Sequence, residues 1–152
     1  MSDSTDTHPA TVHLTQVQDY AFDLAFDGIP ALWRADEPPP LGQGSGPSPE
    51  HLLAAAVANC LSASLLFALR KFKQQPEPIR CQVQATVGRN EQRQMRVLGL
   101  AARLTLGVPA AALEHLDRVL ASFENFCTVT QSVRQGIPVE VAVFDALGVR
   151  LK

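Results

Sequence analysis

Residues 47–72, PSPEHLLAAAVANCLSASLLFALRKF, decide the fold of this chain. Ser48 is a good helix N-cap and Pro49 suits the first helical position. Glu50 lies in the first turn, where a negative charge favours the helix dipole, and cations follow at the far end. The stretch therefore predicts one long helix with Cys60 near its middle.

The apolar side chains of this helix run nearly all the way round it. Such a helix is expected to be buried on most sides, and a sheet together with a second copy of the helix would cover it. It is slightly short for a membrane span, which needs about 20 apolar residues, and Asn59, Ser62 and Ser64 interrupt it. We therefore expect a core helix and no membrane association.

The remaining elements predict an α+β fold with predominantly antiparallel sheets around the long helix. Alternating apolar residues indicate a hairpin over residues 11–27, and Gly and Pro make residues 28–47 a long, partly rigid loop. Further segments are expected as strands at 79–88, 95–106 and 138–144 and as a second helix at 109–126. In the strand at 95–106, Leu98 and Leu100 are expected to share the core face, and Gly99 suggests a β-bulge. We expect residues 11–152 to form a single domain and residues 1–10 to be a disordered N-terminal tail.

The charge and cysteine content of the chain exclude several classes of protein. The net charge is −2, and no charged run is dense enough for a nucleic-acid partner. Three widely spaced cysteines do not make a disulfide framework and fit a reducing, cytoplasmic compartment. No CxxC motif, zinc spacing or haem or flavin motif is present, so neither a metal nor a cofactor is expected.

The three cysteines differ in their surroundings. Cys81 alternates with Val83 on a strand and is interpreted as a core residue. Cys127 continues the apolar stripe of the second helix, four residues after Phe123. Cys60 is either a small core residue or a reactive thiol on a rigid helix, and its own stretch leaves both readings open.

Two segments resemble a known family. LGQGSGPSPEHLLAAAVANCLSASL, residues 41–65, and FENFCTVTQSVRQGIPVEV, residues 123–141, resemble the OsmC/Ohr family of osmotically inducible and organic hydroperoxide resistance proteins. The resemblance extends over about residues 11–147. Thr128 follows the second cysteine where the family commonly has proline, and the DEPPPLGQG loop is closer to the OsmC-like branch.

The resemblance implies a pair of catalytic thiols. Cys60 matches the peroxidatic cysteine, whose thiolate becomes a sulfenic acid, and Cys127 matches the resolving cysteine, which condenses with it to a disulfide. The family activates the first thiol with an arginine held by the glutamate of the helix start, which points to Arg34 and Glu50. An external dithiol reductant, for which the family suggests a lipoyl group, would restore both thiols.

The resemblance also implies an intertwined homodimer. Ten residues of helix span about 15 Å, so Glu50 cannot reach Cys60 of its own chain along a straight helix. Two antiparallel central helices would bring Glu50 of one protomer to Cys60 of its partner.

Two functions follow from these observations. The first is a thiol-dependent peroxidase that reduces organic hydroperoxides in oxidative-stress defence. The second is a non-catalytic OsmC-like stress protein or small-ligand-binding protein. A cation within reach of Cys60 distinguishes the first from the second.

Overall fold

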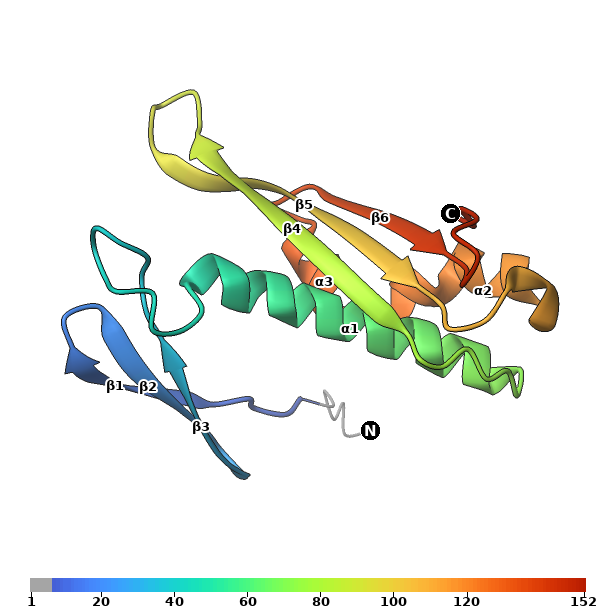
Figure 1. The fold of residues 1–152 in the computed structure, drawn as a ribbon, viewed down its shortest axis with the longest axis horizontal. Coiled ribbons are helices and arrows are strands. Elements are labelled where there is room, and N and C mark those ends of the chain that lie inside the picture. The colour runs from blue at the N-terminus through green and yellow to red at the C-terminus, as the bar shows by residue number, and fades with distance from the viewer. Residues whose placement is uncertain (1–6) are drawn as a thin grey trace, which may run out of the picture. The chain divides into compact units, whose positions relative to one another are not determined.

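The computed structural model describes residues 7–152 (Figure 1). The predicted N-terminal tail lies partly outside the described residues, because the description begins at residue 7. Two compact units make up the chain, one ending at Pro49 and the other running from Glu50 to Lys152. Each unit is described below by itself.

The first unit is an antiparallel three-stranded meander. It contains β1 (Val12–Gln18), β2 (Ala21–Phe26) and β3 (Ile29–Ala35), in the order β1-β2-β3. Leu24 lies opposite Leu14 on one side and opposite Trp33 on the other, so these apolar side chains share one face. The predicted hairpin over residues 11–27 is confirmed by the pairing of β1 with β2.

The prediction of a loop starting at residue 28 was wrong, because β3 follows β2 almost at once. Gly28, with φ of 76°, makes the turn that starts the new strand. Pro30 does not prevent the strand, because β3 is at the edge of its sheet, where a missing N–H is tolerated. The irregular segment is therefore confined to residues 36–48.

The buried carboxylate of Asp36 organises this shorter loop. Its Oδ2 accepts hydrogen bonds from the Gln43 and Ser45 backbone N–H groups and from the Ser45 hydroxyl, at 2.9–3.1 Å. The Ser45 backbone hydrogen bond is the largest influence and holds the pKa of Asp36 below its usual value. Gly42 lies against this carboxylate so closely that any Cβ would collide with it. Asp36 therefore fixes the path of the Gly-rich loop.

The second unit packs helices on one face of a three-stranded sheet (Figure 1). The long helix α1 (Pro49–Lys71) precedes β4 (Arg80–Arg89), β5 (Met95–Thr105) and β6 (Val139–Phe144). The strand order is β4-β5-β6, with β4 and β5 antiparallel and β5 and β6 parallel. Together the two sheets give the predicted α+β class with mostly antiparallel pairing.

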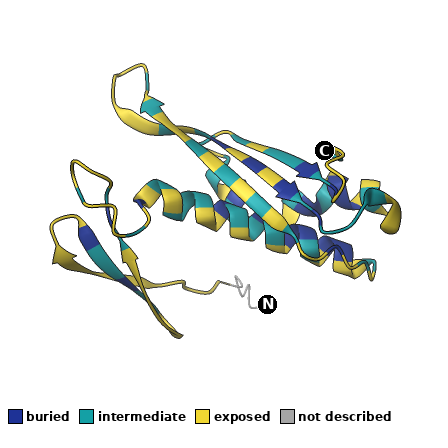
Figure 2. Cartoon of the chain, viewed as in Figure 1, coloured by how far each residue is buried: buried dark blue, intermediate teal, exposed yellow. Residues whose placement is uncertain are grey.

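Helix α1 is a core helix, although its length and composition alone would allow it to cross a membrane. Val57, Leu61 and Leu65 are fully buried, in one cluster with Leu100 and Leu104 of β5. Figure 2 shows the resulting alternation of buried and exposed residues along the sheet. Fully burying one such aliphatic side chain contributes about 1.5–3 kcal/mol, so several of them hold α1 on the sheet.

One residue of β5, Leu98, does not face the core as the sequence predicted. Leu98 was predicted to share the core face with Leu100, yet its side chain is 43% exposed. Thr86 pairs with Gly99 and Val87 with Val97, so Leu98 is the extra residue of a β-bulge. The bulge next to Gly99 that the sequence suggested is present, and it turns Leu98 outward.

The single second helix predicted over 109–126 is divided. The structure instead has η1 (Ala110–Ala112), α2 (Leu116–Ser122), η2 (Phe123–Phe126) and an additional helix, α3 (Thr128–Val133). Leu113 has extended backbone angles and His115 has φ of 58°, which stops a continuous helix. The Asp145 carboxylate accepts the Ala110 N–H at 3.0 Å and so fixes η1 separately.

Candidate active site

The second unit brings Cys60 and Cys127 together. Cys60 is half-buried on α1, whereas Cys127 is fully buried between η2 and α3. The two thiols lie close enough for Cys60 to influence the ionisation of Cys127, and both sulfurs are free. Two thiols 67 positions apart in the sequence are thus neighbours in the fold.

Burial is the main influence on the Cys127 thiol and raises its pKa. The neighbouring Cys60 thiol raises the pKa further, while the Thr130 hydroxyl and backbone N–H oppose the shift. Cys127 therefore favours the protonated form. A thiol of this kind suits the resolving role better than the role of first nucleophile.

A carboxylate held by two cations fixes the segment that carries Cys127. Glu124 on η2 is 2.6 Å from Arg134 and 2.6 Å from Lys152. Lys152 also donates to the Leu120 carbonyl at 2.8 Å. Because Glu124 is three residues before Cys127, these contacts join the thiol segment to the end of α3 and to the last residue.

Acid is expected to weaken this anchor. Burial opposes ionisation of Glu124, but the bonds from Lys152 and Arg134 prevail and hold its pKa below the usual 4.5. A lowered pKa in the folded state gives stability that is present above the unfolded pKa and lost as the pH falls through the folded one. We expect Glu124→Gln to cost about 2 kcal/mol at neutral pH and to flatten the loss of stability below pH 4.5.

Urea unfolding at neutral and acidic pH measures this effect. Glu140→Gln, which removes an exposed carboxylate on β6, is the matched control and should leave the pH profile unchanged. An unaltered profile in Glu124→Gln would contradict the proposed anchor.

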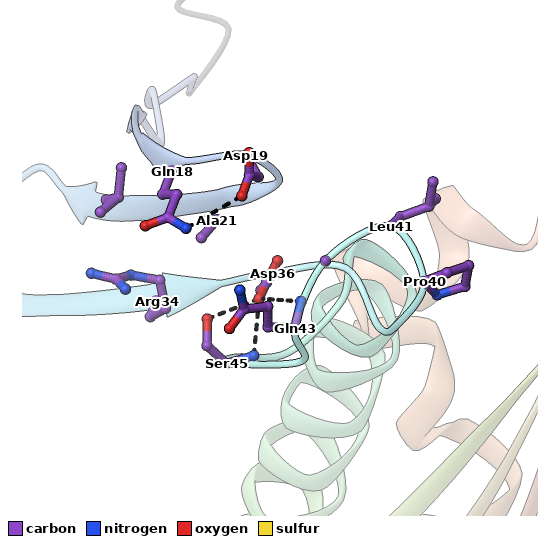
Figure 3. Close-up of a pocket in the computed structure, with 11 residues that line it drawn as sticks. Gln18, Asp19, Ala21, Arg34, Asp36, Pro40, Leu41, Gln43 and Ser45 are labelled. Carbon is purple, nitrogen blue, oxygen red and sulfur yellow. Dashed lines mark hydrogen bonds between the residues drawn. The ribbon is translucent and has the colours of Figure 1, made fainter.

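Arg34 lies on β3, not in the loop where the sequence placed it. Its Nε donates to the Asp23 carboxylate of β2 at 2.6 Å. Figure 3 shows Arg34 and Asp36 among the residues lining an open pocket of about 420 Å³ beside the Gly-rich loop. Glu50, the other predicted member of the activating pair, is in the first turn of α1 and belongs to the second unit. The activating roles of Arg34 and Glu50 stay predictions.

Cys81 is a half-buried residue of β4 that packs against the core, as its alternation with Val83 predicts. Burial raises the pKa of its thiol, and a hydrogen bond with Ser62 of α1 partly opposes this. Both effects fit a structural cysteine.

Sequence reasoning missed Thr130 and Glu124. Thr130 is fully buried and its Oγ1 accepts a hydrogen bond from the Cys127 thiol at 2.9 Å. Its position three residues after the cysteine was a usable signal, because an N-cap side chain lies beside the third residue of the helix that follows. Glu124 gave no comparable signal, since its partners come from distant parts of the chain.

Comparison with solved structures identifies proteins that have a similar fold. The chain is similar to an OsmC-like protein of unknown function from Vibrio cholerae O1 biovar eltor, with a TM-score of 0.77 and 17% identity over 91% of this chain and 100% of that one. It is also similar to the organic hydroperoxide resistance protein OhrB of Bacillus subtilis, with a TM-score of 0.68 and 16% identity over 90% and 98% of the two chains. At these identities the likeness establishes the fold alone.

A third similar structure is an organic hydroperoxide resistance protein from Legionella pneumophila, with a TM-score of 0.70 and 14% identity over 90% and 96% of the chains. The search of curated proteins gave no match. The family model described as OsmC-like protein matches residues 42–142, a segment that contains both Cys60 and Cys127. This match spans more than half of the chain, and the protein therefore belongs to the OsmC-like family.

Proposed function

We propose that this protein is a cysteine-based peroxidase that reduces organic hydroperoxides to alcohols in the cytoplasm. The observation that carries the proposal is the pair of neighbouring free thiols, Cys60 and Cys127. Membership of a family whose structural relatives include organic hydroperoxide resistance proteins supports the choice of substrate. In this proposal residues 11–152 act as one OsmC-like domain.

The first step is attack of the Cys60 thiolate on the outer oxygen of the hydroperoxide. A sulfur–oxygen bond forms and the O–O bond breaks, so Cys60 is oxidised to a sulfenic acid. The alkoxide that leaves takes up a proton and becomes the alcohol. Half-burial leaves the Cys60 sulfur accessible to such a substrate.

The second step closes the disulfide. The Cys127 sulfur attacks the sulfenic sulfur of Cys60, the S–O bond breaks, and the departing hydroxide leaves as water with the proton of the Cys127 thiol. An external dithiol then reduces the disulfide by two exchange steps and is itself oxidised. The resemblance to the family suggests a lipoyl group as this dithiol.

Mass analysis of the intact protein tests the proposal. The reduced protein is treated with cumene hydroperoxide and then analysed with and without dithiothreitol. We expect the loss of two hydrogens and a Cys60–Cys127 linkage in the peptide map, both reversed by the dithiol. Unchanged thiols after prolonged exposure would reject the peroxidase function.

The open pocket near Arg34 favours a second candidate function. Its polar and apolar lining, with Arg34 and Asp36 on one side and Leu41 on the other, suits a small ligand (Figure 3). The chain would then be a non-catalytic ligand-binding stress protein. Under this alternative the thiols survive peroxide treatment.

We also propose that the protein is a homodimer. Phe67 on α1 and Phe126 on η2 contact edge to face with ring centroids 6.2 Å apart, yet they remain 54% and 52% exposed. A second copy would remove these rings from water. We expect a dimer at micromolar concentration in sedimentation experiments, and Phe67→Glu should weaken it. A fully active monomer would exclude a site shared between protomers.

A further inference from the structure

The Cys127 sulfur has a polar partner in an otherwise apolar region. Thr130 of α3 is fully buried and accepts a hydrogen bond from the Cys127 thiol at 2.9 Å. Apolar side chains such as Phe123, Val143 and Leu104 belong to the same core cluster as Cys127. A buried hydroxyl at this distance from the sulfur restricts the rotation of the Cys127 side chain.

We propose that Thr130 is a positioning residue for disulfide formation, which holds the Cys127 sulfur beside Cys60 and donates to that sulfur when it becomes a thiolate. The inference rests on the proposed function, because the reaction it serves is the attack of Cys127 on the Cys60 sulfenic acid. Under this proposal the reaction depends on three residues, Cys60, Cys127 and Thr130.

The chemistry follows from the two roles of a hydroxyl, which accepts a hydrogen bond through its lone pairs and donates one through its O–H. In the resting state the thiol donates to Thr130 Oγ1. When the Cys127 proton passes to the sulfenic oxygen of Cys60, ahead of S–S bond formation and loss of water, the Cys127 sulfur can no longer donate. The Thr130 O–H then rotates and donates to the negative sulfur, and the charge is not left unpartnered in the core.

Few charged groups act on this site within the described part of the chain. Cys60 faces Cys127 from α1 and raises the pKa of its thiol. Glu124 on η2 is paired with Arg134 after α3 and with Lys152, at 2.6 Å in each case. The strands that pack against the site, β5 and β6, contribute apolar residues to the cluster.

The direct test is titration of Cys127 alone. In a chain with Cys60→Ser and Cys81→Ser, the ultraviolet absorbance of the thiolate reports the ionisation of Cys127 against pH. Thr130→Val removes the hydroxyl at nearly constant volume and should move the midpoint upward. Thr130→Ser keeps the hydroxyl and should restore the original curve. Thr128→Val, which removes an exposed hydroxyl next to Cys127, is the matched control and should leave the curve in place.

The kinetic readout uses the chain with Cys60 and Cys127 intact. We expect Thr130→Val to slow conversion of the Cys60 sulfenic acid to the disulfide about tenfold at neutral pH, with recovery at alkaline pH. A role limited to packing of the Thr130 methyl group predicts the opposite order, with Thr130→Ser impaired and Thr130→Val normal. That order, or superimposable titration curves for Thr130→Val and the unsubstituted residue, would overturn the proposal.

The two proposals fail separately. If no peroxide oxidises Cys60, the peroxidase function is rejected. The titration of Cys127 still decides whether Thr130 stabilises its thiolate, because that measurement needs no peroxide.

Discussion

Cys60→Ser is expected to abolish peroxide consumption, because serine offers no thiolate to attack the O–O bond. Peroxide loss with dithiothreitol as the reductant measures the effect. Cys127→Ser should still react once, and it should leave a sulfenic acid on Cys60 that dimedone traps, or a mixed disulfide with the reductant. This difference separates the two thiol roles.

Cys81→Ser is the matched control for both variants. It also removes a thiol, but one whose partner is Ser62 and not a second sulfur, so turnover should hardly change. Wild-type turnover in Cys60→Ser would end the peroxidase interpretation.

Arg34→Ala is expected to slow the reaction of Cys60 at neutral pH by about tenfold or more, with much of the loss recovered at alkaline pH. The reason is general: an opposite charge within about 4–6 Å shifts a pKa by about 1–3 units in favour of the charged form. Arg34→Lys should rescue only in part, because lysine cannot reproduce the planar fork that arginine presents to a carboxylate. The measurement is the pH dependence of Cys60 alkylation in a chain lacking Cys81 and Cys127.

Two further variants serve as a test of the Arg34–Asp23 ion pair and as a control. Asp23→Asn removes the carboxylate charge that pairs with Arg34 on the sheet and tests whether that ion pair orients the guanidinium. Arg96→Ala removes an exposed cation at the start of strand β5 and should leave the reaction of Cys60 unchanged. Identical alkylation curves for wild type and Arg34→Ala would mean that another group activates Cys60, or that none does, and the ligand-binding function would gain.

Much of the fold could be predicted from local sequence signals. The cap at Ser48, the proline after it and the all-round apolar pattern identified α1. Strict alternation identified β4 and β6, because a strand with one buried face repeats every two residues. These signals lie within one element and need no knowledge of distant partners.

The errors came from contacts that one segment does not encode. Pro30 suggested a loop, but an edge strand tolerates it. The break between η1 and α2 depends partly on Asp145, thirty-five residues away, which holds Ala110. Leu98 turned outward because of a bulge whose register is set by β4. In each case tertiary context overrode local preference.

In the candidate site, too, the residues marked by local motifs were predicted, and those that depend on distant contacts were not. Cys60 and Cys127 were recognised from two motifs, and the fold makes the two thiols neighbours. Thr130 was overlooked although it is only three residues after Cys127, and Glu124 could not be found because Lys152 and Arg134 reach it through the fold. The pairing of Arg34 with Asp23 depends on the register of β2 and β3, which the sequence did not fix once β3 was read as a loop.

The unequal burial of the two sulfurs determines the regiochemistry of reduction under the proposed function. An incoming dithiol meets the half-buried sulfur of Cys60 before it can meet Cys127, which has no exposed surface. The entering thiolate therefore bonds to Cys60, and Cys127 departs as the leaving group into a closed, apolar space. A thiolate expelled there is a poor leaving group unless a hydrogen-bond donor receives it, and Thr130 is already in contact with that sulfur. The mixed disulfide formed during reduction thus joins the reductant to Cys60 on α1. Cys127, in the connection between β5 and β6, is released as the thiolate.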